Sequence, residues 1–170
     1  MDTKRTAVFY GSTTGTTKDV AFRLARIMGI DDKDVYNVKD ISPSVLGQYQ
    51  NIIAGTSTWG DGQMQADWWD FVDGMSALSL PKAKVALFGC GDETMSDTFC
   101  SAVGELYRRF KATGAVMIGE FDTVGYDYSH SGAEIDGHIV GLLLDEVNHP
   151  EATNLRLRAW AQQLKDEFSK

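Results

Sequence analysis

The sequence predicts one α/β domain built on a five-stranded parallel sheet, and two observations carry this prediction. Short apolar runs alternate with segments whose apolar residues recur every three or four positions, which is typical of strand–helix–strand units. The length of 170 residues fits one domain, and 43% hydrophobic with 24% charged residues supply an ordinary core and surface. We therefore expect a single domain over residues 1–170.

Five segments rich in Val, Ile, Ala and Phe are the predicted strands, because strands covered by helices on both faces are apolar throughout. They are residues 6–10, 35–38, 51–55, 84–88 and 116–120. A second apolar run follows at residues 139–144, after a segment without periodicity at 121–136. Loops of this length are uncommon in compact domains and are often functional. A surface flap over the edge strand explains the segment equally well.

Helical periodicity fills the intervals between the predicted strands. Val20, Leu24 and Ile27 share one face, and Gly29 is suited to end that helix. The pair Ser42 and Pro43 predicts the start of a short helix. Three further apolar sets have the same spacing: Trp68, Phe71, Val72 and Met75; Phe99, Val103, Leu106 and Phe110; and Leu157, Trp160, Leu164 and Phe168.

The charge balance excludes some partners and favours others. The 24 acidic residues outnumber the 16 basic ones and leave a formal charge of −8, which repels nucleic acid and anionic lipid and attracts basic protein surfaces. No apolar run approaches the roughly 18 residues that span a membrane, and the first run is too short for a signal peptide. The sequence thus predicts a soluble, cytoplasmic protein that binds neither nucleic acid nor membranes.

Spacings typical of metal sites and of hydrolytic triads are missing from the sequence. His130, His138 and His149 do not follow a metal-binding pattern. Cys90 and Cys100 form no C-x-x-C pair and are too few for a four-thiolate site, so we expect small, buried, reduced thiols. The serines near the predicted loops lack the G-x-S-x-G context. We expect no metal site and no catalytic residues.

A cluster of hydroxyl residues follows the first predicted strand and leads directly into a helix. The sequence Gly-Ser-Thr-Thr-Gly-Thr-Thr at residues 11–17 places five hydroxyls where a helix N-terminus offers unpaired N–H groups and partial positive charge. The spacing fits neither a Walker A loop nor the G-x-G-x-x-G motif. A terminal monophosphate held by neutral donors fits the loop better than a nucleoside triphosphate, and a merely capped helix is the simpler alternative.

Two more loops follow the third and fourth strands. Residues 55–62 place Trp59 among turn residues, where an indole either plugs the core or offers a flat face to a planar ligand. Residues 89–97 are also rich in glycine and acidic residues. In doubly wound sheets the loops after strands one, three and four meet at the ligand-binding edge. These loops therefore predict one shared binding site.

Together the three loops resemble those of the flavodoxins, and the resemblance covers nearly the whole chain. It implies a three-layer α/β/α fold of strand order 2-1-3-4-5 with FMN at the carboxyl edge of the sheet. Residues 121–136, with the Gly-Leu-Leu-Leu-Asp sequence at 141–145, resemble the long-chain subgroup, in which a long loop interrupts the fifth strand.

The resemblance also implies which residues meet FMN. The phosphate loop would be Ser12, Thr13, Thr14, Gly15, Thr16 and Thr17. Trp59 would pack on one face of the flavin, and Thr58 and Asp145 would approach the ribityl chain. The backbone of Gly60, Asp61, Gly91 and Asp92 would meet the polar edge of the ring. The family usually has a tyrosine over the outer face, whereas here Met95 falls closest to that place.

The function that the resemblance implies is low-potential electron transfer. Non-covalent FMN would shuttle single electrons between a reductase and acceptor redox enzymes. The chain would be a monomer that binds to basic surfaces of these partner proteins. An FMN-dependent quinone or nitro-compound reductase on the same fold is the alternative. A phosphoacceptor domain is disfavoured, because Gly11 and Ser12 stand where it needs an acidic pair, and Gly55 and Thr56 where it needs an aspartate.

Overall fold

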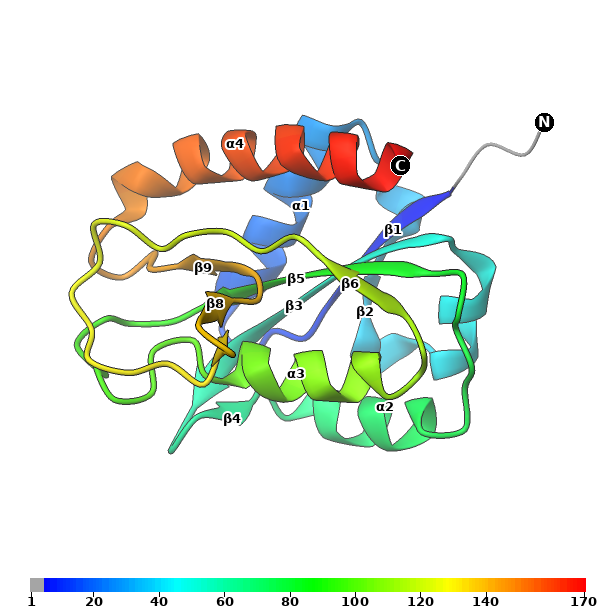
Figure 1. The fold of residues 1–170 in the computed structure, drawn as a ribbon, viewed down its shortest axis with the longest axis horizontal. Coiled ribbons are helices and arrows are strands. Elements are labelled where there is room, and N and C mark those ends of the chain that lie inside the picture. The colour runs from blue at the N-terminus through cyan, green and yellow to red at the C-terminus, as the bar shows by residue number, and fades with distance from the viewer. Residues whose placement is uncertain (1–4) are drawn as a thin grey trace.

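The computed structural model describes residues 5–170, which form three layers around a central parallel sheet (Figure 1). The strands of that sheet are β1 (Thr6–Tyr10), β2 (Val35–Asn37), β3 (Asn51–Trp59), β5 (Lys84–Cys90) and β6 (Val116–Ile118). They lie in the order β2-β1-β3-β5-β6. Counted along these parallel strands alone, the order is 2-1-3-4-5, so the predicted topology is confirmed.

Helices cover both faces of the sheet. α1 (Thr16–Met28) and α4 (Pro150–Ser169) lie on one face, and α2 (Asp67–Met75) and α3 (Ala102–Lys111) on the other (Figure 1). Short 3-10 turns connect them at Asp32–Asp34, Val38–Asp40 and Pro43–Gln48. The α3 helix begins after Phe99, which belongs to the preceding loop. Within residues 5–170, no helix has the length and apolar character needed to cross a membrane.

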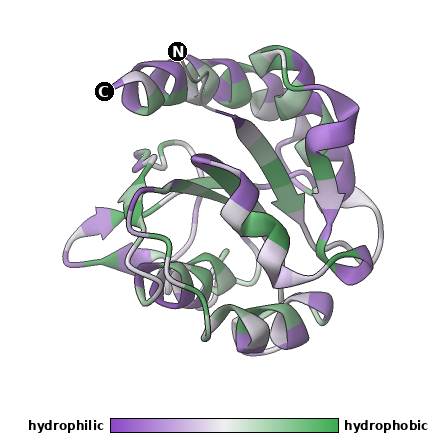
Figure 2. Cartoon of the chain, turned by 90° about the vertical axis from the view of Figure 1, so that its right-hand side faces the viewer, coloured by the Kyte–Doolittle hydropathy of each residue, from purple (hydrophilic) through white to green (hydrophobic). Residues whose placement is uncertain are grey.

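The sheet separates two apolar clusters, which explains why its strands are apolar throughout. Successive residues of a strand point to opposite faces, so Ile52 and Ala54 pack toward α2 and α3 while Ile53 packs toward α1 and α4. All three are fully buried. In Figure 2 the central strands are coloured hydrophobic, and the hydrophilic colour lies mainly on the surrounding helices and loops.

The edge of the sheet is shared by two strands, as the sequence predicts. β6 pairs with the first half of β5, where Ala86 lies beside Ile118, and β9 (Leu142–Leu144) pairs with its second half, where Phe88 lies beside Leu142. Between them run an irregular segment, residues 119–133, and a small hairpin of β7 (Glu134–Ile135) and β8 (His138–Ile139). We call residues 119–133 the long loop.

The third strand is longer than predicted. It continues past Gly55 to Trp59 and pairs with the antiparallel strand β4 (Gln63–Met64), because β-branched and aromatic residues follow Gly55 and favour extended backbone. The turn of this hairpin is closed by the Gly62 N–H, which donates to the Trp59 carbonyl at 3.2 Å. The strand β5 also extends two residues further than predicted, to Cys90. Most of the loop predicted at residues 55–62 is therefore a β-hairpin.

The long loop packs so closely on α3 that one glycine of that helix has no space for a methyl group. A Cβ at Gly104 would lie 2.0 Å from the Gly132 carbonyl oxygen. We expect Gly104→Ala to lower the free energy of unfolding by about 1 to 3 kcal/mol, since backbone would have to move. Gly47→Ala is the control, because no atom lies within 4 Å of its Cβ position. Urea denaturation compares them, and equal midpoints would contradict the predicted contact.

Candidate functional site

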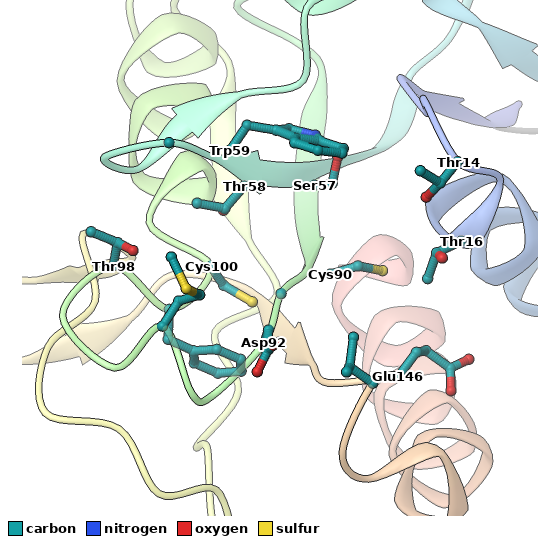
Figure 3. A pocket seen from close by; sticks show the side chains of 15 residues that line it. Thr14, Thr16, Ser57, Thr58, Trp59, Cys90, Asp92, Thr98, Cys100 and Glu146 are labelled. Atoms are coloured by element: carbon teal, nitrogen blue, oxygen red, sulfur yellow. The ribbon is translucent and has the colours of Figure 1, made fainter.

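A cavity of about 350 Å³ opens where the carboxyl ends of β1, β3 and β5 meet, the place predicted for the ligand (Figure 3). All three predicted loops contribute to its lining, and so does the turn after β9. The lining residues are Thr14, Thr16, Ser57, Thr58, Trp59, Gly60, Cys90, Gly91, Asp92, Met95, Thr98, Phe99, Cys100, Glu146 and Val147.

The hydroxyl loop forms one end of this cavity. Gly15 has φ of +97°, which lets the chain turn abruptly into α1, and the Asp19 N–H donates to the Gly15 carbonyl at 2.9 Å to start the helix. The exposed side chains of Thr14 and Thr16 lie together at the cavity (Figure 3). The first N–H groups of a helix lack intrahelical partners and carry partial positive charge. This end of the cavity can therefore bind an anion.

The remaining hydroxyls of the loop have partners inside the protein. Ser12 Oγ accepts the Gly15 N–H at 3.1 Å, and Thr13 Oγ1 accepts the side-chain N–H of Gln65 at 3.1 Å. Thr17 is buried. None of these three side chains lines the cavity. They hold the shape of the loop, and Gln65 is a supporting residue that sequence reasoning missed.

The β3–β4 hairpin forms the wall of the cavity that carries Trp59. The indole is 43% exposed, and its N–H donates to Ser57 Oγ at 2.7 Å, which fixes the edge of the ring. Thr58 Oγ1 accepts the Ala102 N–H at 3.1 Å, so the hairpin is tied to the start of α3. Gly60 lines the cavity, whereas the exposed Asp61 does not.

The loop after β5, residues 91–97, forms the facing side, and we call it the second loop. The Gly91 N–H donates to the Leu144 carbonyl at 2.9 Å, and a Cβ on Gly91 would lie 2.9 Å from Cys100 Sγ. Hydrogen bonds from the Thr94 hydroxyl and N–H lower the pKa of Asp92. Met95 lines the cavity and is 56% exposed. The site thus has a flat indole on one loop and a flexible thioether on the other.

The predicted role of Asp145 does not fit its position. The side chain is fully buried, and its carboxylate accepts four hydrogen bonds at 2.8 to 3.0 Å. The donors are the backbone N–H groups of Glu93, Val147 and Asn148 and the Asn148 side chain. Since both oxygens are used inside the protein, Asp145 holds the turn at 145–149, and Glu146 and Val147 line the cavity in its place.

Known proteins of one family resemble this chain over nearly its whole length. The family model described as Flavodoxin matches residues 8–160 of the chain. The chain belongs to the flavodoxin family. Flavodoxin 1 of Azotobacter vinelandii is 39% identical over 174 residues, covering 96% of this chain and 97% of the relative. Flavodoxin 1 of Escherichia coli K12 is 36% identical over 165 residues, covering 96% of this chain and 94% of the relative.

A solved flavodoxin has the same fold over nearly its whole length. The crystal structure of Fusobacterium nucleatum flavodoxin bound to flavin mononucleotide aligns with a TM-score of 0.89 and 27% identity. The alignment covers 98% of this chain and 99% of that one. The three-layer flavodoxin fold predicted from the sequence is therefore confirmed.

Several residues of this flavodoxin site were not predicted from the sequence. Cys90, Cys100 and Phe99 lie at the inner wall and are buried, and such apolar residues have no signal that distinguishes them from core. Burial raises the pKa of the Cys90 thiol to about 12 and that of Cys100 well above its ordinary value. Both thiols therefore stay protonated and act as small apolar surfaces.

A half-buried charge pair lies next to the hydroxyl loop. Glu146 lines the cavity, and its carboxylate is paired with the guanidinium of Arg23 on α1. Arg23 also bonds Asp19 at 3.1 Å and Asn154 at 2.6 Å. The Arg23 charge offsets that of Glu146, so the carboxylate does not oppose an anion at the hydroxyl loop. The two residues are 123 positions apart, and the sequence has no sign of the pair.

One histidine lies in a cluster that its sequence spacing does not reveal. Ligand atoms of Glu93, Asp145 and His149 lie within 4.8 Å of one another, close enough for a cation. The Asp145 oxygens, however, already accept N–H groups of the protein. Within the cluster, His149 Nε2 instead lies 2.6 Å from Glu93 Oε1, at hydrogen-bonding distance.

Proposed function

We propose that the cavity holds FMN without a covalent bond, with the phosphate at the hydroxyl loop and the ring beside Trp59. As a member of the flavodoxin family, the chain is an FMN electron-transfer protein and not an enzyme. The observation that carries the site proposal is the cavity itself, which joins an anion-binding helix end to an exposed indole.

The proposed phosphate contacts are the hydroxyls of Thr14 and Thr16 and the free N–H groups where α1 begins. Ser12, Thr13, Gly15 and Thr17 shape this loop, by the internal contacts described above. Neutral donors at a helix N-terminus bind a terminal phosphate without a lysine. Arg23 supports the same end by pairing with Glu146.

The proposed ring contacts come from the other two loops. Trp59 would cover one face and Met95 would lie over the outer one, since both line the cavity and both are exposed. The backbone of Gly60 and Asp61 on the hairpin and of Gly91 and Asp92 on the second loop would meet the polar edge. Thr58 would lie near the ribityl chain. Asp145 has no such role in our proposal, because its carboxylate is fully hydrogen-bonded.

When bound, FMN supplies the electron chemistry. Phe99, Cys90 and Cys100 exclude water along the inner wall of the cavity. The side with Trp59 and Met95 is exposed, so redox partner proteins can approach the cofactor there. Fixed negative charge on the protein disfavours added negative charge on a bound cofactor, which favours a low reduction potential. The enzyme alternative is not favoured, since the flavodoxin relatives are electron carriers.

The chain works with redox partner proteins, as its family does. We propose further that a reductase donor and an oxidoreductase acceptor dock through basic surfaces, since the net charge is −8 and Asp61, Asp67, Asp70 and Asp73 lie on or beside the hairpin and α2. We also propose that residues 1–170 act as one cytoplasmic, monomeric FMN-binding domain.

The absorption spectrum of the purified protein tests the proposal directly. We expect a yellow protein with one FMN per chain, released on denaturation and identified by mass. Reduction by a flavoprotein reductase and reoxidation by an acceptor protein should follow without turnover of quinone or nitro substrates. A colourless protein that does not take up added FMN would contradict the site.

Met95→Tyr tests the placement of Met95 over the outer face. An aromatic stack on the electron-poor oxidised ring is worth about 0.5 to 1.5 kcal/mol beyond area burial, and reduction weakens it. We expect tighter binding of oxidised FMN and a lower first reduction potential. The potential should fall by about 59 mV for each tenfold gain in the affinity for oxidised over one-electron-reduced FMN. Calorimetry and potentiometry measure the two effects. If neither quantity changes, Met95 does not cover the ring.

A further inference from the structure

Glu93 connects three segments that are distant in sequence. It lies in the second loop, and its carboxylate accepts the Asp127 N–H of the long loop at 2.6 Å through Oε2. Its other oxygen contacts His149 Nε2 at 2.6 Å, at the start of α4. Its backbone N–H donates to Asp145 Oδ2 at 3.0 Å. One side chain thus ties the second loop to the long loop and to the turn at 145–149.

His149 is the titratable base of this junction and is surrounded by acidic groups. Glu93 faces its Nε2 from the second loop, and Glu151 of α4 lies 3.5 Å from its Nδ1. Asp145 adds negative charge from the turn. From the long loop, the Tyr126 ring lies 5.3 Å from the imidazole, centroid to centroid, and the Arg156 guanidinium of α4 lies over that same tyrosine. The His149 side chain is 29% exposed.

The junction is continuous with the inner wall of the cavity. The Tyr126 ring packs edge-on against Phe99 at 5.4 Å, and its hydroxyl accepts the Asp145 N–H at 3.2 Å. Phe99 lines the cavity, as does Val147, two residues before His149. A change in the contact between Glu93 and His149 would therefore reach the cavity through both the second loop and the turn.

We propose that the Glu93–His149 pair positions the second loop and the turn at 145–149 around FMN, so that FMN affinity depends on the protonation of His149. The inference rests on the proposed binding of FMN in this cavity. Protonated His149 offsets the charges of Glu93, Asp145 and Glu151. Loss of its proton leaves three carboxylates close together around a neutral ring, which loosens the two segments.

The direction of the pH effect follows from the environment of His149. The hydrogen bond with Glu93 is the largest cause that raises the His149 pKa above its ordinary value. The pairing is therefore complete below the ordinary histidine pKa of about 6.5 and is lost as pH rises through the raised value. If FMN binds the ordered segments better, FMN binding must in turn raise the His149 pKa further. FMN affinity should fall over the same range.

FMN dissociation constants of matched variants test the proposal between about pH 5.5 and pH 9, which brackets the histidine range. His149→Gln and Glu93→Gln remove the pair. His138→Gln is the control, because His138 also faces a glutamate, Glu120 at 3.6 Å, but its side chain is 66% exposed and does not line the cavity. The FMN phosphate also titrates in this range. The dissociation constant of each variant is therefore divided by that of the wild type at the same pH, and the effect of the phosphate cancels in this ratio.

We expect His149→Gln and Glu93→Gln to weaken FMN binding about two- to fivefold near pH 6, as for a partly exposed ion pair, with the His149→Gln ratio approaching one near pH 9. The control ratio should stay at one. A His149→Gln ratio that does not change with pH would overturn the proposal.

NMR titration of His149 in the wild-type chain provides a readout that does not depend on any variant. We expect its pKa to be higher with FMN bound than in the apoprotein, and equal values would overturn the coupling. A wild-type chain that binds no FMN at any pH would overturn the proposed function and this inference with it. FMN binding with equal histidine pKa values would overturn the inference alone.

Discussion

Riboflavin should bind the apoprotein at least about 100-fold more weakly than FMN, because it lacks the phosphate for which the hydroxyl loop is suited. Hydrogen bonds to a charged group contribute about 1.5 to 3 kcal/mol each, so two such bonds account for this factor. Thr14 and Thr16 are the side chains available for them, since Ser12 and Thr13 have partners within the protein. Flavin fluorescence titration of the apoprotein measures both constants.

The double variant Thr14→Val with Thr16→Val shows whether these hydroxyls cause the difference. We expect it to weaken FMN binding about 100-fold while leaving riboflavin binding unchanged, because only FMN presents a phosphate to the loop. Riboflavin therefore acts as an internal control for damage to the fold. A parallel loss for both ligands would mean that the hydroxyls support the cavity but do not contact the phosphate.

Trp59→Ala should weaken FMN binding by about 2 kcal/mol, or about 30-fold, because it removes both buried apolar area and a ring stack. Trp59→Phe should recover part of this loss. Trp69→Ala is the matched control, since Trp69 is 37% exposed on α2 and does not line the cavity. Calorimetric titration with FMN measures the three affinities.

Tryptophan fluorescence separates the roles of the two exposed indoles. In the wild type we expect FMN to quench a large part of the emission, and in Trp59→Ala a smaller part. The indole of Trp59 is held by Ser57 at 2.7 Å, so it is oriented before the ligand arrives. If Trp59→Ala and Trp69→Ala lose affinity equally, Trp59 has no special contact with the ring and acts only through the hairpin.

The long loop contacts the second loop more extensively than a simple flap over the edge strand would. Ser129 N–H and His130 N–H both donate to the Ser96 carbonyl, at 3.0 and 2.9 Å, and Ser129 Oγ donates to Asp97 at 2.7 Å. Tyr128 packs on Phe99 with 4.9 Å between ring centroids. The loop therefore supports the cavity wall, a role that its sequence, which lacks periodicity, does not predict.

The sequence by itself determined the fold class and the three loops at the site, because both depend on local patterns. Apolar runs at the strand period and helical spacing in Val20, Leu24 and Ile27 are properties of short segments, and the hydroxyl loop at residues 11–17 is contiguous. The split edge strand was predictable too, since the two apolar runs are separated by a segment without periodicity.

Tertiary structure alone decided the contacts between segments. Asp145 looked available to a ligand, but folding buries it among N–H groups of the second loop and of its own turn. His149 follows no metal-binding pattern in the sequence, but in the fold it contacts Glu93, 56 positions away. The hairpin beyond Gly55 depends on pairing with Gln63–Met64. Each is set by which strand ends meet at the sheet edge, and hydrophobic periodicity has no information about polar groups brought together there.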